Sequence, residues 1–114
     1  MGGTIEQWPL TVCDARTIDE SRLTQTRREP PVRPDPSFEY NRSSETRHAI
    51  FDPAHTWCWF PRMTADEVLL FKNFDTRTDG TARYALHSAF QDPDIPANPA
   101  PRETIETRAF VFYD

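Results

Sequence analysis

The side chain with the clearest capacity for chemistry in this 114-residue sequence is His87. It lies in the segment 86–90, Leu-His-Ser-Ala-Phe, between a predicted strand and a proline-rich loop. An imidazole in this place can bind a metal ion or act as a general base. A histidine can also serve only to hold such a loop, in the core or at the surface. Local composition leaves both interpretations open.

Arg108 is the second candidate, and it lies within the last predicted strand, residues 103–113. Alternation places its side chain on the same face as two phenylalanines. A charge in a hydrophobic strand must be paired or must face a polar cavity. The guanidinium can clamp a carboxylate through two parallel hydrogen bonds. It can equally form an ion pair with an acid such as Glu106 or Glu67.

An aromatic strand is predicted over residues 55–60, His-Thr-Trp-Cys-Trp-Phe. Its alternation puts His55, Trp57 and Trp59 on one face. A histidine on such a face is more often a packing residue than a metal ligand. Cys58, on the opposite face and between two tryptophans, is predicted to be a buried and inert thiol.

The elements that must position these side chains are mostly strands. Alternating polarity and enrichment in β-branched or aromatic residues predict extended segments. These segments are residues 10–12, 45–51, 55–60, 68–75, 81–85 and 103–113. Asp52-Pro53-Ala54 predicts a turn, and Asp79-Gly80 predicts a hairpin that returns antiparallel. We therefore expect a mainly β, antiparallel fold in which the apolar run over residues 68–71 is buried.

Helical structure is expected in only one or two short turns. Asp19 can start a single turn within residues 17–23. Thr64 and Glu67 match a capping box, in which the Thr64 side chain caps the Glu67 amide and the Glu67 carboxylate reaches back. Eleven prolines in the chain oppose any longer helix.

The prolines cluster in two segments, 27–36 and 92–101, that we predict to be loops. The first segment could instead be a polyproline ligand for a partner domain. The length indicates one domain over residues 1–114, or part of one. The eight Phe, three Trp and three Tyr can supply a core for it.

Charge and composition exclude several classes of protein. The net charge is −5 and the arginines are scattered among acids, which argues against nucleic-acid binding. No apolar run approaches the roughly 20 residues that span a bilayer, and no secretory signal is visible. Cys13 and Cys58 are too few for a disulfide framework and lack metal-type spacing. We therefore predict no membrane association and a reducing, cytoplasmic location.

Several segments, in order along the chain, resemble one known family. Residues 9–16 resemble its PLAxCDAR segment, and residues 52–60 resemble NPxHxWYYF. Residues 63–72 resemble MTPDEVLLFK, and residues 87–90 with 101–109 resemble HTAF…PPRESIEVRA. The family is that of the AsaB/CmcJ-like fungal hydroxylases and desaturases, which includes gibberellin-desaturase-like proteins.

The resemblance implies a partial jelly-roll fold and the chemistry of iron(II)- and 2-oxoglutarate-dependent oxidoreductases that hydroxylate or desaturate small secondary metabolites. That chemistry uses two histidines and one carboxylate on one face of the iron. His87 falls where the second histidine lies in the family. Arg108 falls where the family has the arginine that binds 2-oxoglutarate. His55, Trp57 and Trp59 are then expected in the wall of the substrate pocket.

The resemblance covers only the C-terminal portion of the family pattern. The upstream His-x-Asp pair of the family occurs nowhere in these 114 residues, so we expect a fragment with an incomplete iron site. Its unpaired edges and apolar face favour self-association or binding to a partner oxygenase. Whether the chain is itself an enzyme stays open. The alternatives are a non-catalytic accessory or binding module of the same family, and a small β domain in which His87 and Arg108 are structural.

Overall fold

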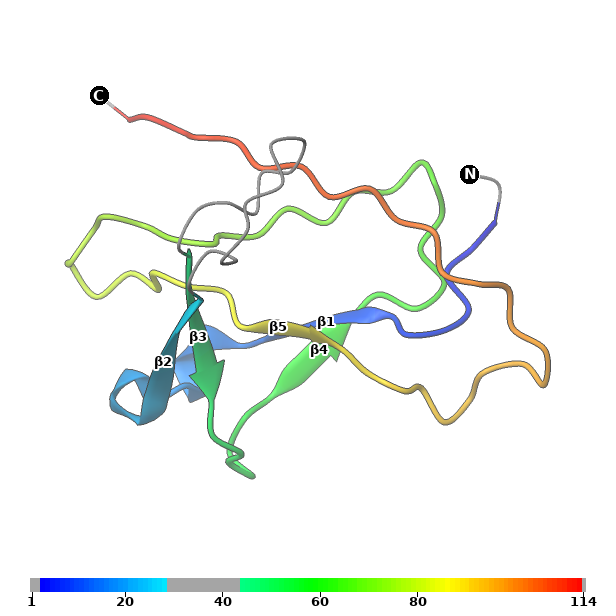
Figure 1. Ribbon diagram of the computed structural model, residues 1–114, viewed down its shortest axis with the longest axis horizontal. Helices are drawn as coiled ribbons and strands as arrows, with labels where there is room; N and C mark the ends of the chain where they lie inside the picture. The colour runs from blue at the N-terminus through cyan, green and yellow to red at the C-terminus, as the bar shows by residue number, and fades with distance from the viewer. Residues whose placement is uncertain (1–2, 29–43, 114) are drawn as a thin grey trace. The chain divides into compact units, whose positions relative to one another are not determined.

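The computed structural model describes residues 3–28 and 44–113, and within these residues the fold is mainly β. The regular elements are short strands and 3₁₀ turns (Figure 1). The strands are β1 (Leu10–Cys13), β2 (Leu23–Arg28), β3 (Ser44–Ala49), β4 (Trp57–Trp59) and β5 (His87–Ala89). The 3₁₀ turns are η1 (Ala15–Thr17) and η2 (Glu20–Arg22). Among the described residues, no helix has the length and apolar character needed to cross a membrane.

The chain divides into two compact units. The first unit comprises Met1–Thr11, Trp59–Phe71 and His87–Asp114. The second unit comprises Val12–Cys58 and Lys72–Leu86.

A three-stranded sheet has the order β4-β1-β5. The Cys13 amide donates to the Leu86 carbonyl at 2.9 Å, and the Phe90 amide donates to the Pro9 carbonyl at 3.3 Å. Residues later in β1 pair with residues earlier in the chain around β5, so β1 and β5 run antiparallel. The buried residues of the described part are Pro9, Thr11 and Cys13, whose spacing of two places them on one face.

A second sheet consists of β2 and β3, which pair antiparallel from Leu23 opposite Ala49 to Arg28 opposite Ser44 (Figure 1). The prediction of a strand near β3 is confirmed, whereas β2 was not expected from its polar sequence. Its last two residues, Arg27 and Arg28, fall within the segment 27–36 that the sequence predicts to be a loop. Residues 29–36 of that segment lie outside the described residues. Pairing with β3, rather than an apolar pattern, makes β2 a strand.

The short turns follow local side-chain chemistry. The Asp19 carboxylate accepts from the Ser21 amide at 3.0 Å and caps η2, as predicted. The Glu67 carboxylate also reaches back to the Thr64 amide, at 2.8 Å. The other half of the predicted capping box is wrong, because the Glu67 amide bonds the Thr64 carbonyl and not its side chain. This contact closes a turn, and no helix follows it.

The predicted hairpin around Gly80 is present without strands. The Ala85 amide donates to the Lys72 carbonyl at 2.9 Å, and the rings of Phe74 and Tyr84 lie 5.7 Å apart. Gly80 adopts a φ of 91°, which only glycine accepts readily. The two arms therefore face each other, but too few backbone hydrogen bonds join them to form strands over the predicted ranges.

Three predictions of burial or strand structure are wrong. Val68 and Leu70 are 88% and 92% exposed and lie in no strand, although residues 68–71 were expected in the core. No strand forms over 103–113, which is drawn as a plain tube in Figure 1. Cys58 is exposed and not buried. Apolar and alternating sequence makes these segments extended, but burial needs a covering layer, and the described residues do not provide one there.

Candidate functional site

His87 begins β5 in the first unit, and its side chain is accessible to solvent. Its ring centroid lies 4.5 Å from that of Phe71, with the two rings tilted by 48°. Phe71 is itself half-buried, so it gives the imidazole an apolar support on one side. A supported and accessible imidazole is suited to binding a ligand and equally to packing at the end of a strand.

Arg108 lies in an extended segment of the first unit, and its carboxylate partner is Glu106. Nη2 of Arg108 and Oε1 of Glu106 are 2.6 Å apart. The two side chains are 75% and 67% exposed, so solvent screens the pair and it contributes little to stability. In the structure Arg108 thus forms an ion pair with Glu106, one of the two acids that the sequence offered as partners. The same exposure leaves the guanidinium able to exchange Glu106 for another carboxylate.

The aromatic residues make contacts close to their own strands. In the second unit, the rings of His55 and Trp57 meet edge to face with centroids 6.4 Å apart, consistent with the predicted shared face. In the first unit, Trp59 meets Phe90 edge to face at 5.2 Å. Trp57 and Trp59 are 39% and 43% exposed. Both tryptophans therefore present part of their indole rings to solvent.

His55 also lines a shallow hollow of the second unit, with a volume of about 190 Å³ that includes open solvent. Its neighbours there include Asp19, Arg22 and Asp52, and the last two form an ion pair. Neither tryptophan of the aromatic strand lines this hollow. The hollow is open to solvent and encloses no cavity, so it does not form a binding pocket for a small molecule.

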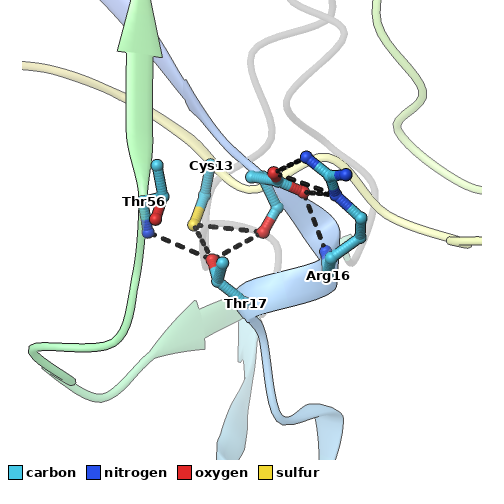
Figure 2. A network of polar contacts seen from close by, with 5 residues as sticks. Cys13, Arg16, Thr17 and Thr56 are labelled. Atoms are coloured by element: carbon cyan, nitrogen blue, oxygen red, sulfur yellow. Dashed lines mark hydrogen bonds and ion pairs between the residues drawn. The ribbon is translucent and has the colours of Figure 1, made fainter.

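Sequence reasoning missed a polar network that joins the end of β1 to the chain before β4. The Thr17 hydroxyl donates to the Asp14 carbonyl at 2.7 Å and accepts from the Thr56 amide at 3.1 Å. The Cys13 sulfur lies 3.7 Å from the same hydroxyl, and Figure 2 shows dashed lines from Thr17 to both Cys13 and Thr56. One hydroxyl therefore holds segments 39 residues apart in sequence. The sequence signal that could have indicated this network is the motif over residues 9–16. The role of the network is structural.

Removing the Thr17 hydroxyl should weaken the second unit. Thr17→Val leaves the Thr56 amide and the Asp14 carbonyl without this partner, so we expect a loss of about 1 kcal/mol in the free energy of unfolding. Thr17→Ser keeps the hydroxyl and is the matched control. Urea unfolding followed by tryptophan fluorescence measures both variants. A loss in Thr17→Val no larger than that in Thr17→Ser would contradict a specific stabilising role of the hydroxyl.

Asp14 is the most strongly perturbed acid of this network. Its carboxylate accepts from the Arg16 amide at 3.0 Å and from Nη2 of Arg16 at 2.5 Å. The Arg16 side-chain hydrogen bonds, followed by that of the backbone amide, lower the pKa of Asp14 from 3.8 to about 2. The N-cap of η1 therefore stays charged far into the acid range.

A carboxyl NMR titration should find the pKa of Asp14 near 2 and should find it raised in Arg16→Ala. The variant value should stay below 3.8, because the amide of residue 16 still donates. Since the folded pKa lies below the unfolded one, the stabilisation is complete above about pH 4 and is lost as the pH falls through about 2. A wild-type pKa near 3.8 would contradict the network.

A second set of contacts missed from sequence holds the start of the first unit. The Ala100 amide donates to the Glu6 carboxylate at 2.8 Å, and the Gln7 side chain donates to the Ala100 carbonyl at 3.0 Å. Arg102 donates to the Trp8 carbonyl at 2.7 Å. Trp8 has a φ of 51°, a strained conformation for a bulky residue, and these bonds help to hold it. Arg102 is thus a structural anchor at the end of the second proline-rich segment.

The described residues do not assemble a complete metal site. Within 3–28 and 44–113, no three His, Cys, Asp or Glu side chains lie close enough together to hold a metal ion. His87 is the predicted ligand, and a facial iron site needs two further protein ligands. The described side chains therefore do not fit an iron(II) centre by themselves.

Comparison with known proteins identifies the relatives of this chain. The model of a family described as an oxidoreductase/YMDC permease-like domain matches residues 1–112. The chain belongs to this oxidoreductase family. Members of the family among the curated proteins are fungal hydroxylases and desaturases, so the resemblance inferred from the motifs is confirmed.

Three of these family members show how much of a longer protein the chain represents. The hydroxylase/desaturase CTB9 of Cercospora beticola is 41% identical over 93% of this chain and 32% of its own length. The hydroxylase/desaturase efuI of Hormonema carpetanum is 42% identical over 96% of this chain and 37% of its own length. The Fe(II)/2-oxoglutarate-dependent dioxygenase nvfI of Aspergillus novofumigatus is 33% identical over 92% of this chain and 35% of its own length. The chain thus spans about a third of the length of these relatives.

Proposed function

We propose that this chain is part of an oxidoreductase that hydroxylates or desaturates a small secondary metabolite with iron(II) and 2-oxoglutarate. The observation that carries this proposal is the match over almost the whole chain to relatives named as hydroxylases/desaturases and as a Fe(II)/2-oxoglutarate-dependent dioxygenase. The proposal includes a jelly-roll fold, completed by polypeptide of the kind that the relatives carry outside the matched region, and a cytoplasmic location.

In this proposal His87 is one protein ligand of the iron. Its exposure and its apolar support from Phe71 are compatible with that role. Arg108 binds the distal carboxylate of 2-oxoglutarate, for which it exchanges its solvent-exposed contact with Glu106. The face of His55, Trp57 and Trp59 contributes to the wall of the substrate pocket, since exposed indole surface suits small organic ligands. The other metal ligands come from outside these 114 residues.

An anaerobic titration with iron(II) in the presence of 2-oxoglutarate tests the proposal. The 114-residue chain is compared with a chimera in which it replaces the matching segment of CTB9. We expect stoichiometric binding by the chimera and binding at least about 100-fold weaker by the chain alone, because one imidazole cannot close a facial site.

Two results would overturn the proposal in different ways. Tight stoichiometric binding by the 114-residue chain would show that the ligand set lies within it. A folded chimera that binds neither iron(II) nor 2-oxoglutarate would favour the non-catalytic accessory or binding module. The Fe(II)/2-oxoglutarate-dependent dioxygenase nvfI is the positive control for both measurements, and unmodified CTB9 is the reference for the chimera.

A further inference from the structure

Two arginines and two aromatic residues of the second unit stack on one another. Cζ of Arg47, on β3, lies 4.4 Å from the centroid of the Tyr84 ring. Cζ of Arg83 lies 5.1 Å from the centroid of the Phe74 ring and 5.7 Å from that of Tyr84. The two rings are themselves 5.7 Å apart. These four residues come from three separate segments of the chain, and we call them the arginine–aromatic cluster.

The cluster holds its guanidinium groups in place without using up their donors. A guanidinium over an aromatic ring is held by its face, while the N–H donors around its edge can still bind oxygen atoms. Arg83 is fixed further, because its Nε donates to the Asp75 carbonyl at 3.0 Å. Arg47 is exposed and Arg83 is half-buried, so both groups can be reached from solvent.

The positive charge of the cluster is not neutralised within the part of the chain that the structure describes. No carboxylate of residues 3–28 and 44–113 forms an ion pair with Arg47 or Arg83. The Asp75 carboxylate binds Nζ of Lys72 instead, at 2.5 Å. Two cations beside one ring repel each other, and an anion bound to both would remove that repulsion. The cluster is therefore prepared for an anionic group.

We propose that the arginine–aromatic cluster is a docking surface for an acidic segment of a partner polypeptide, whose Asp or Glu carboxylates pair with Arg47 and Arg83. Charge complementarity identifies this occupant, because a carboxylate matches the fork of a guanidinium and accepts two parallel hydrogen bonds. Tyrosine and arginine are also the residue types that contribute most to the affinity of protein interfaces. The inference goes beyond the proposed oxidation chemistry and does not depend on it.

A polypeptide fits this surface better than other anionic ligands do. Phe74 is 56% exposed, so the cluster presents an open surface. Small ligands usually need a concave site that buries most of their area, whereas a polypeptide can cover an open one. A nucleic acid is disfavoured by the net charge of −5, which repels a continuous phosphate backbone.

An NMR titration of the 114-residue chain with an acidic peptide tests the proposal, with no need for iron or 2-oxoglutarate. The probe is an acetylated and amidated hexapeptide in which glutamate alternates with alanine. The matched control peptide has glutamine in place of glutamate. We expect the Nε–H signals of Arg47 and Arg83 to shift saturably, with a dissociation constant of about 1 mM, and the glutamine peptide to bind at least about 10-fold more weakly.

Substitutions assign the binding to the cluster. Arg47→Gln and Arg83→Gln should each weaken peptide binding by about 10-fold, because a charge-assisted contact is lost. Arg27→Gln is the matched control, since Arg27 is an exposed arginine of the same two-stranded sheet and lies opposite Glu45, and its effect should be below about 2-fold. Tyr84→Leu keeps both charges but removes the ring that both guanidinium groups contact, and should weaken binding by about 3-fold.

Five results would overturn the inference. Equal affinity for the two peptides would show that carboxylates are not recognised. Equal losses in Arg47→Gln and Arg27→Gln, or unchanged binding in Tyr84→Leu, would show a response to overall charge and not to the cluster. Tighter binding of an oligodeoxythymidylate than of the acidic peptide would assign the surface to nucleic acid. A dimeric mass in light scattering that Arg47→Gln converts to a monomeric one would assign it to a second copy.

None of these measurements involves iron(II), 2-oxoglutarate or turnover. Failure of the docking proposal is therefore distinguishable from failure of the proposed function.

Discussion

Replacing His87 with alanine in the CTB9 chimera is expected to reduce the affinity for iron(II) by more than about 100-fold. Loss of a residue that only supports a metal ligand typically costs 10–100-fold, and loss of the ligand itself should cost more. Formation of oxidised product should fall with it. Anaerobic calorimetric titration measures the affinity, and product analysis by mass spectrometry measures the activity.

His48→Ala is the matched control for this experiment. His48 is an exposed histidine on β3, and the proposal gives it no role in metal binding. Its removal should leave the affinity for iron(II) unchanged. If His87→Ala binds iron(II) as tightly as the chimera and only lowers its melting temperature, the imidazole has a packing role beside Phe71.

Arg108→Ala should weaken binding of 2-oxoglutarate to the chimera by about 10- to 100-fold. A hydrogen bond to a charged group contributes about 1.5–3 kcal/mol, and each 1.4 kcal/mol is a factor of ten in affinity. Arg108→Lys should restore part of the loss, because an ammonium keeps the charge but not the paired donors. Affinity for iron(II) without 2-oxoglutarate should stay the same, which separates this effect from that of His87.

Glu106→Gln is the informative control for Arg108. It removes the acidic partner seen in the structure, while the guanidinium remains. Because the pair is exposed, the variant should lose little stability and should bind 2-oxoglutarate as well as the unmodified chimera. An equal loss of affinity in Glu106→Gln and Arg108→Ala would contradict the clamp, since it would mean that the ion pair itself is needed.

Several of the features predicted successfully are decided by residues near one another in the chain. The cap of Asp19 on η2 and the reach of Glu67 back to the Thr64 amide each involve residues within three positions. The turn at Asp52 is similar, because its carboxylate accepts from the Ala54 amide at 2.9 Å. Hydrogen bonds between residues two or three positions apart depend on the local sequence, so they can be predicted from it.

The failures concern burial and strand pairing, which depend on distant parts of the chain. The polar segment of β2 becomes a strand because β3 lies beside it. The apolar run containing Val68 and Leu70 was expected to be buried, yet both side chains are exposed. Periodicity shows which side chains share a face, but it does not show whether another layer covers that face. Cys58 was misjudged for the same reason.

For this protein, the sequence by itself determined the family, the antiparallel β character and the candidates His87 and Arg108, because motifs and alternation are properties of the chain order. Only the tertiary structure decided that Arg108 faces Glu106, that Thr17 joins two distant segments, and that residues 103–112 pair with no strand of the described residues. Those facts depend on which segments meet in space, and the free energy of such contacts is a property of the folded chain as a whole.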